Sequence, residues 1–352
     1  MDRPAALGTR LQRNVGSARG SVDGLGRYRV VYRSVDGSVT AYALVEGALL
    51  AGRTEPNRTA RVTTRVDAPA APFTYERRPA VTDDGRYGVV VPYVGDYQLG
   101  DRTVTVSEEA VRRGATVGAT GSTAYWALDE GRGGVLFDRA GGHHALAEDV
   151  QWVPGVQDDA LSVTRESRVT VRDLSGMDTR DGFTVSLWVR TREDVDYRES
   201  VQFPRLVSTA GSVADRPVAG YRLYLSSGEA AGAVGDGDEE VFVSGPAIDD
   251  GRWHHVAMTW DGETLRLFVD GERYGERAWA VAPTPGRSLA IGASTEQFNR
   301  FSGFLDEVRI RDEAVSPARL REEASAGRNA TASRVEPPSP APVPGPVPGP
   351  ER

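Results

Sequence analysis

Two residue types that support specific chemistries are absent from this sequence. The 352 residues include no cysteine, which excludes disulfides, thiolate-bound zinc, iron–sulfur clusters and cysteine nucleophiles. All 42 basic residues are arginine, so lysine is absent too. Long apolar runs are also missing, because stretches such as Gly88–Val94 fall far short of the roughly 20 residues of a membrane helix. We therefore expect no membrane-spanning segment in this chain.

The charge balance is acidic and uneven along the chain. The sequence has 50 Asp and Glu residues and a formal charge of −8 at pH 7, and the acidic excess lies beyond residue 120. Nucleic-acid binding needs clustered basic side chains, so we expect no nucleic-acid partner. Excess carboxylate favours solubility, and this lysine-free acidic composition is typical of a GC-rich, halophilic source.

Composition divides the chain into segments. Residues 1–27 lack the apolar stretch of a secretory signal peptide and are predicted to be flexible. Residues 28–111 contain short strand patterns and the turn dipeptides Asp36-Gly37 and Asp84-Gly85, which predict two hairpins in a small Ig-like β-sandwich. The small residues of 112–122 predict a linker. The Pro-rich residues 327–352 predict a disordered tail.

Residues 123–326 repeat the strand pattern at greater length. Runs such as Phe183–Arg190 and Tyr221–Ser226 predict strands, whereas only Ser316–Ala326 predicts a helix, with Ser316 as its N-cap. The chain has no alternation of strands and helices and no glycine-rich phosphate loop. The sequence therefore predicts an all-β fold and argues against an organic cofactor such as a dinucleotide.

Motifs in this second part occur in the order seen in LamG-like, concanavalin A-like jelly-roll domains. They are Tyr125–Gly131, Asp138–Leu146, Trp152–Gly155, Gly182–Arg190, Gly220–Ser226, Asp250–Glu272 and Phe301–Ile310. Residues 121–325 resemble that family, which implies a jelly-roll sandwich. Similar modules bind carbohydrates or other proteins at cell surfaces. The resemblance therefore implies a glycan or surface-protein partner and a location at the cell surface or outside the cell, although no signal peptide is visible.

The first part resembles the C-terminal peripheral β-domain of archaeal oligosaccharyltransferases. The matching pieces within residues 24–111 are Gly26–Ser34, Val45–Gly52, Phe73–Arg78 and Thr82–Tyr93. The Trp-Trp-Asp motif and the multi-span membrane region of those enzymes are missing here. This resemblance implies, as an alternative function, a detached extracytoplasmic accessory portion for protein N-glycosylation that cannot itself transfer glycan.

The residues of a hydrolase are not arranged for catalysis in the sequence. Glycosidases use two carboxylates that flank one bond, but the nearest pairs, Asp129-Glu130 and Asp306-Glu307, are adjacent on strands and point to opposite faces. A Gly-x-Ser-x-Gly elbow is absent. The four histidines form two adjacent pairs, which favours structural roles over zinc binding. We expect no enzyme activity, and a glycoside hydrolase of concanavalin A-like fold stays an alternative.

Asp306 is the candidate for a structural calcium site. Its alternation with Val308 and Ile310 predicts a place on the core face, where a carboxylate must be paired or coordinated. Jelly rolls that resemble this chain join their first and last strands through a calcium ion, bound by an aspartate near each end and by carbonyls of a glycine-rich turn. The ligands implied by the resemblance are Asp138, Gly141, His143 and Asp306. The alternative is that Asp306 accepts hydrogen bonds from loop amides.

Aromatic residues on polar strand faces are the candidates for ligand binding. Trp188 shares a face with Arg190, and Tyr224 shares one with Arg222. Sugar rings stack on aromatic rings, and their hydroxyls bond to arginine, so these four residues are predicted to floor a groove. The alternative is that the tryptophans fill or cover the sandwich core. The sequence therefore predicts a non-catalytic recognition module of the cell envelope.

Overall fold

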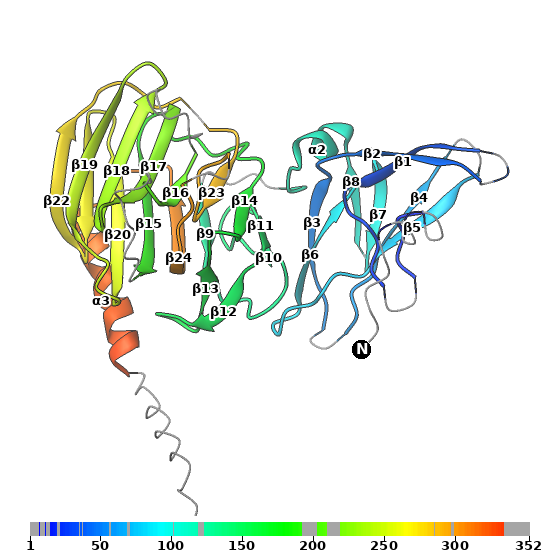
Figure 1. Ribbon diagram of the computed structural model, residues 1–352, viewed down its shortest axis with the longest axis horizontal. Helices are drawn as coiled ribbons and strands as arrows, with labels where there is room; N and C mark the ends of the chain where they lie inside the picture. The colour runs from blue at the N-terminus through cyan, green and yellow to red at the C-terminus, as the bar shows by residue number, and fades with distance from the viewer. Residues whose placement is uncertain are drawn as a thin grey trace, which may run out of the picture.

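The computed structural model describes residues 7, 11, 15–19, 22–34, 36, 38–55, 58–68, 71–100, 102–118, 123–191, 203–209, 219–284, 286–296 and 299–333. Figure 1 shows two β domains side by side, with a long helix, α3, at the far side of the second domain. Strands dominate the regular structure of the described residues, so the predicted all-β class is confirmed. The described part of the chain contains no helix with the length and apolar character needed to cross a membrane.

The first domain is a small β-sandwich. Its elements are β1 (Tyr28–Arg33), β2 (Thr40–Leu44), β3 (Ala48–Arg53), β4 (Val62–Val66), β5 (Phe73–Arg77), β6 (Arg86–Val91), β7 (Gly95–Leu99), β8 (Arg102–Val106) and α2 (Glu108–Arg113). Strands β5, β4, β7 and β8 form one sheet, and β3 pairs with β6. Alternate residues of β6, Tyr87, Val89 and Val91, are at most 3% exposed. They pack with Tyr75 and Tyr97 of the four-stranded sheet in one core.

One predicted hairpin of this domain is confirmed and the other is wrong. Strands β1 and β2 pair antiparallel on either side of Asp36. Strand β5 instead pairs with β4, and β6 pairs with β3. The turn at Asp84 and Gly85 therefore joins strands of different sheets. Gly85 has φ of 84°, so this turn has the same residue chemistry as a hairpin turn, and the sequence does not distinguish the two.

The N-terminal residues that the structure describes pack on the first domain, contrary to the predicted flexibility of residues 1–27. The Ala18 amide donates to the Glu76 carbonyl at 2.8 Å. Arg77 Nη2 pairs with an oxygen of Asp23 at 2.8 Å. These contacts hold residues 15–19 and 22–27 against β5.

The predicted linker at residues 112–122 also differs from the structure. Helix α2 continues to Arg113 and ends at Gly114, whose φ is 69°. Beyond it, the Leu49 amide donates to the Ala115 carbonyl at 2.9 Å, and the Val117 amide donates to the Leu49 carbonyl at 2.9 Å. Residues 112–118 therefore belong to the first domain, and residues 119–122 lie outside the described residues.

The second domain consists of two facing sheets. Its strands are β9 (Ala124–Trp126), β10 (Val135–Leu136), β11 (Ala145–Glu148), β12 (Gln151–Pro154), β13 (Asp159–Val163), β14 (Arg168–Val171), β15 (Phe183–Arg190), β16 (Arg205–Ser208), β17 (Ala219–Ser226), β18 (Glu229–Asp236), β19 (Glu240–Ala247), β20 (Trp253–Trp260), β21 (Thr264–Val269), β22 (Glu272–Ala278), β23 (Leu289–Ile291) and β24 (Gly303–Arg311). The helix-side sheet has the order β12-β13-β24-β15-β20-β21-β22, with β9 paired to β24. The domain-side sheet has the order β10-β11-β14-β23-β16-β17-β18-β19.

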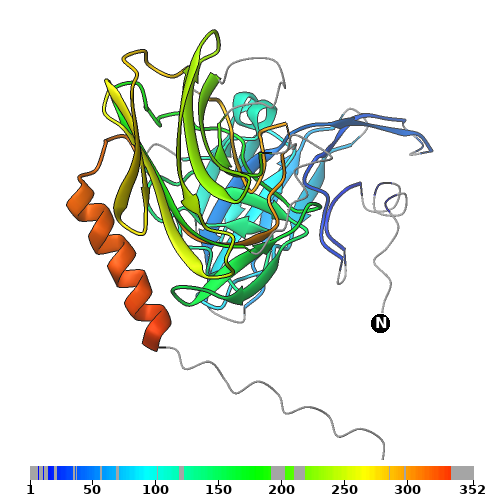
Figure 2. The ribbon, with the colours of Figure 1, turned by 60° about the vertical axis from the view of Figure 1, so that its left-hand side comes forward.

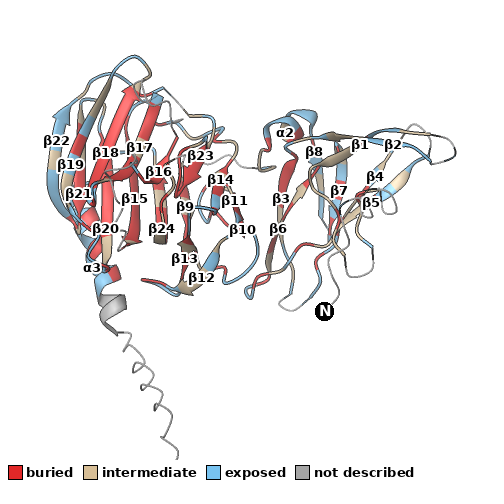
Figure 3. Ribbon diagram, viewed as in Figure 1, coloured by how far each residue is buried: buried red, intermediate tan, exposed pale blue. Residues whose placement is uncertain are grey.

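The core of the second domain lies between these sheets, as the buried residues in Figure 3 show. Val185, Leu187 and Val189 of β15 are fully buried. They share one apolar cluster with Leu223 of β17 and Val234 of β18. Burying such side chains stabilises the fold by about 1.5–3 kcal/mol each.

Helix α3 (Pro317–Ser333) lies along the outer face of the helix-side sheet, as Figure 2 shows. Leu320 is fully buried against Ala257 and Phe268 of that face. The helix was predicted to end at Ala326, so its continuation corrects the predicted start of the disordered tail at residue 327. Residues 334–352 lie outside the described residues.

Candidate binding site

Four neighbouring strands of the helix-side sheet place a row of side chains on its outer face. In the strand register, Phe304 of β24 lies between Ser162 of β13 and Arg190 of β15, and Trp253 of β20 lies next to Arg190. Val189, which precedes Arg190, is buried in the core, so the alternation of the strand turns this row outward. All four side chains are partly exposed. We call these residues the Phe304 row.

The members of the Phe304 row contact one another. The Arg190 guanidinium lies 5.4 Å from the centroid of the Phe304 ring, within the range of a cation–π interaction. The Trp253 ring lies 6.4 Å from the Phe304 ring at an interplanar angle of 54°. Two aromatic rings, a guanidinium and a hydroxyl group therefore lie in one line on an accessible surface.

A cavity of about 450 Å³ opens beside the row, and this volume is within the usual range for small-molecule sites. Its lining residues are Ser162, Val163, Thr164, Arg190, Thr191, Ser302, Gly303 and Phe304. Gly303 is required where the chain enters β24, since a Cβ there would lie 2.5 Å from the Phe301 ring and 2.7 Å from the Arg190 carbonyl. The lining includes four hydroxyl side chains, one cation and one aromatic ring, a combination that suits a polyhydroxylated ligand.

Trp188 does not take part in this site, although it was predicted to floor a groove together with Arg190. Its side chain is only 2% exposed and lies beneath α3, where a Cβ on Gly327 would meet its ring at 2.2 Å. The Trp188 ring also lies 5.4 Å from that of His255. The prediction is wrong for Trp188, because the helix covers the outer face at this point.

Arg222 and Tyr224 lie on the other sheet, so the four predicted residues do not form one groove. Tyr224 is 5% exposed. The guanidinium groups of Arg205 and Arg222 lie 5.0 and 5.1 Å from its ring centroid, and Arg222 Nη2 donates to Glu240 at 3.0 Å. Burial, and then the charge of Arg222, lower the pKa of Arg205 to about 9. This cluster is packed into the domain-side sheet, where the buried Tyr224 ring is not available for stacking on a sugar.

Asp306 is buried as predicted, but on the other face of its sheet. Glu307 has φ of 55°, and the pairing of β15 with β24 shifts register between Ser186 and Trp188. This β-bulge inserts a residue. Asp306 therefore lies beside Trp188 on the outer face of the sheet, whereas Val308 lies on the core face. The sequence contained no sign of the bulge.

Asp306 accepts hydrogen bonds from loop amides, which was the alternative to calcium binding. One carboxylate oxygen accepts from the Val156 amide at 2.7 Å and from the Gln157 amide at 3.3 Å. The other oxygen is buried without a hydrogen-bond partner among the described residues. Burial, and then the charge of Glu307, raise the pKa of Asp306 to about 8.

The residues implied for calcium do not form a ligand set. Asp138 accepts from the amides of Tyr125, Ala140, Gly141 and His143 at 2.8 to 3.1 Å. These four bonds use the acceptor capacity of a carboxylate. Within the described ranges, no cluster of three or more His, Asp or Glu residues suits a metal ion. The residues present do not fit the implied site, and calcium binding stays an untested prediction.

The adjacent carboxylate pairs lie away from the Phe304 row, and Asp129 and Glu130 line a separate cavity of about 170 Å³. Asp306 is fully buried and Glu307 is 3% exposed, and Glu307 accepts from the Tyr125 hydroxyl at 2.9 Å. Asp129 pairs with Arg139. Glu130 is 6% exposed and accepts from a backbone amide. Neither pair lies on the Phe304 row.

Sequence reasoning found Arg190 but missed Phe304, and it did not name Trp253 as a binding residue. The available signal was the alternation of Phe304 with Leu305 at the start of β24, which turns Phe304 outward. Its pairing with Arg190 depends on the order of strands in the sheet, which the sequence does not state.

The second part of the chain matches a known family. The family model described as the concanavalin A-like lectin/glucanases superfamily matches residues 164–321. Two curated relatives are the sushi, von Willebrand factor type A, EGF and pentraxin domain-containing protein 1 of Rattus norvegicus and of Mus musculus. They are 22% identical over 159 and 155 residues, which is 42% and 41% of this chain. The matches span only 4% of the length of those relatives.

Solved structures are similar at low identity. Domain 4 of AbnA, a GH43 extracellular arabinanase from Geobacillus stearothermophilus solved with arabinotriose, is 17% identical with a TM-score of 0.44, covering 57% of this chain and 97% of that one. The binding domain of Paraclostridial Mosquitocidal Protein 1 is 15% identical with a TM-score of 0.45, covering 58% and 51%.

The resemblance of residues 24–111 to oligosaccharyltransferases gains no support from these comparisons and stays a prediction. For the second part, the ordered motifs, the facing sheets and the family match agree. Residues 164–321 lie in a LamG-like jelly-roll domain of the concanavalin A-like lectin/glucanases superfamily.

Proposed function

We propose that this chain is a non-catalytic recognition module that binds glycan at the Phe304 row. The observation behind this proposal is the line of Phe304, Arg190 and Trp253 beside an open cavity of about 450 Å³. The rings supply flat apolar surface for a sugar ring, and the guanidinium and hydroxyl groups supply donors for its oxygens. The jelly-roll family supports a cell-surface or extracellular location for this activity.

The proposal favours binding over hydrolysis because no carboxylate lines the described cavity. A glycosidase needs an acid and a second carboxylate on either side of the bond that it cuts. Asp306 and Glu307 are buried, so a polysaccharide bound at the row does not reach them.

A glycan array probed with the full chain and two variants tests the proposal. We expect Phe304→Ala to lose signal by at least tenfold, about 1.4 kcal/mol, because the ring is the central member of the row. Phe242→Ala is the matched control, since Phe242 is 58% exposed on β19 of the other sheet. Its array profile should equal that of the wild type.

Arg190→Gln provides a second variant that keeps the packing of the row and removes the charge. It should weaken the same array signals while its melting temperature stays near that of the wild type. If the wild type binds no glycan, or if Phe304→Ala and Arg190→Gln leave every signal unchanged, the proposed site is wrong.

A further inference from the structure

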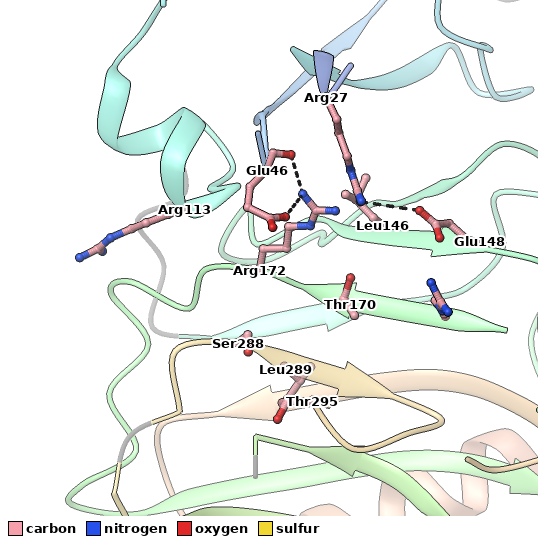
Figure 4. Close-up of a pocket in the computed structure, with 11 residues that line it drawn as sticks. Arg27, Glu46, Arg113, Leu146, Glu148, Thr170, Arg172, Ser288, Leu289 and Thr295 are labelled. Atoms are coloured by element: carbon pink, nitrogen blue, oxygen red, sulfur yellow. Dashed lines mark hydrogen bonds and ion pairs between the residues drawn. The ribbon is translucent and has the colours of Figure 1, made fainter. Parts of the chain in front are cut away.

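A second cavity, of about 460 Å³, lies between the two domains. Figure 4 shows side chains reaching into it from both sides, with Arg27 extending from the first domain toward Glu148 of the second. On the opposite side, Arg172 pairs with Glu46 at 2.8 Å. We call this cavity the interdomain cleft. It lies on the domain-side sheet, opposite to the sheet of the Phe304 row.

The floor of the cleft comes from strand β14. Val169 and Val171 are buried in the core, so the alternation turns Arg168, Thr170 and Arg172 outward into the cleft. Ser288 and Thr295 join Thr170 in the lining and add their hydroxyl groups to it. The cleft therefore combines hydroxyl groups and guanidinium groups with the carboxylates of Glu46 and Glu148.

The arginines of the cleft are not equally engaged. Arg172 is held by Glu46, to whose carbonyl it also donates at 2.6 Å. Arg113 pairs with Glu109 at 2.5 Å. Both guanidinium groups are engaged by the protein, and the Arg172–Glu46 pair joins the two domains.

Arg168 lacks a carboxylate partner among the described residues. Its cross-strand neighbour in the register is Glu148, whose carboxylate instead lies 3.7 Å from Arg27 across the cleft. Both members of that ion pair are exposed, at 40% and 52% of the side chain, and exposed pairs at this distance contribute little. One unpaired guanidinium and one weakly paired guanidinium therefore border the same cavity.

We propose that the interdomain cleft binds an acidic oligosaccharide, with a carboxylate of the ligand between Arg168 and Arg27. Arginine binds carboxylates through paired hydrogen bonds. Because Glu148 pairs with Arg27 and not with Arg168, the ligand carboxylate pairs with Arg168 instead. The hydroxyl groups of Thr170, Ser288 and Thr295 bond to those of the sugar. This site differs in place and ligand class from the Phe304 row, so it does not rest on the function proposed above.

Calorimetric titration of the full chain tests the site with a panel of tetrasaccharides of galacturonate, glucuronate or guluronate. Two further probes are the methyl ester of the tetrasaccharide that binds most tightly, which is neutral, and sodium sulfate. We expect saturable binding of at least one acidic tetrasaccharide and at least tenfold weaker binding of its ester. Sulfate should bind at least tenfold more weakly than the saccharide, since it makes none of the hydroxyl contacts.

Arg168→Gln should reduce the affinity for the acidic tetrasaccharide at least tenfold. The matched control is Arg273→Gln, because Arg273 is 56% exposed on β22 of the other sheet. Phe304→Ala should leave this affinity unchanged, which separates the two sites. The proposal is overturned if no acidic tetrasaccharide binds, if the ester or sulfate binds equally well, or if Arg168→Gln binds as the wild type does.

Discussion

Asp306 shows how one residue depends on the sheet around it. The alternation of β24 predicted its burial correctly, but the bulge at Glu307 moved it to the face covered by α3. There it bonds to the turn at Val156, and Gly155 fits because a Cβ would meet an Asp306 oxygen at 2.6 Å. The carboxyl group therefore ties the β12–β13 turn to the sheet.

We expect Asp306→Asn to change how stability depends on pH. A carboxyl group with a folded-state pKa near 8 holds a proton in the folded protein that it has lost in the unfolded chain above pH 4. The stability that this carboxyl group adds to the folded protein is fully present below pH 4 and is lost as the pH rises toward 8. The wild type should lose ~2–4 kcal/mol between pH 5 and pH 8 through this group, and the variant should not. Urea unfolding at both pH values measures the free energy of unfolding. An equal change between pH 5 and pH 8 in the wild type and the variant would rule the explanation out.

His255 has the opposite effect on the pH dependence. It is 1% exposed, both ring nitrogens lack a hydrogen-bond partner among the described residues, and burial lowers its pKa to about 4. The unfolded chain binds a proton here below pH 6.5 and the folded protein does not, so stability falls as the pH drops from 6.5 toward 4.

In His255→Leu the loss of stability between pH 7 and pH 5 should therefore be smaller by ~1–2 kcal/mol. Urea unfolding at the two pH values tests this, because any packing change is common to both. A loss equal to that of the wild type would show that His255 is protonated in the folded state.

At the scale of elements, α3 decides which part of the helix-side sheet is open. The helix covers Trp188 and Phe268, and the Phe304 row lies at strand ends outside its contacts. Leu320 is the buried anchor of this packing.

Leu320→Ala should lower the free energy of unfolding by ~2–5 kcal/mol, the usual cost of a cavity at a buried leucine. The control is Arg321→Ala, whose side chain is 57% exposed and whose loss should cost under 1 kcal/mol. Chemical unfolding followed by tryptophan fluorescence measures both. Equal stabilities for the two variants would mean that α3 does not pack as described.

The sequence predicted the positions of helices and strands better than it predicted which of them pack against one another. The start of α3 followed from Ser316 and Pro317, and β15 followed from its composition. The end of α3 was missed because Gly327 lies inside the helix against Trp188, where a glycine usually indicates a stop. Arg190 could be placed on an outer face, but its neighbour Phe304 is more than 100 residues away in the chain, and only the fold brings them together.

At the scale of the whole molecule, an apolar contact joins the domains. Leu49 of the first domain packs with Val135 and Phe137 of the second, and the Arg86 guanidinium lies 5.5 Å from the Phe137 ring. Gly88 allows this approach, since a Cβ there would lie 2.6 Å from Val135. Sequence periodicity indicates that a face is apolar, but it does not indicate that another domain covers it.

Gly88→Val should separate the domains, because the nearest atoms that the added side chain meets belong to Val135 across the interface. We expect a larger radius of gyration in small-angle X-ray scattering and weaker binding of acidic tetrasaccharide, since Arg27 moves away from Arg168. An unchanged radius together with unchanged binding would show that this contact does not hold the domains.

The most direct test of the account is a calorimetric titration with the oligosaccharide that gives the strongest Phe304-dependent array signal, followed by mass analysis of the recovered sugar. We expect saturable binding to the wild type and to Phe242→Ala, at least tenfold weaker binding to Phe304→Ala, and recovery of the sugar intact. Equal affinity for Phe304→Ala, or recovery of shortened fragments, would contradict the conclusion that the Phe304 row holds a glycan without cleaving it.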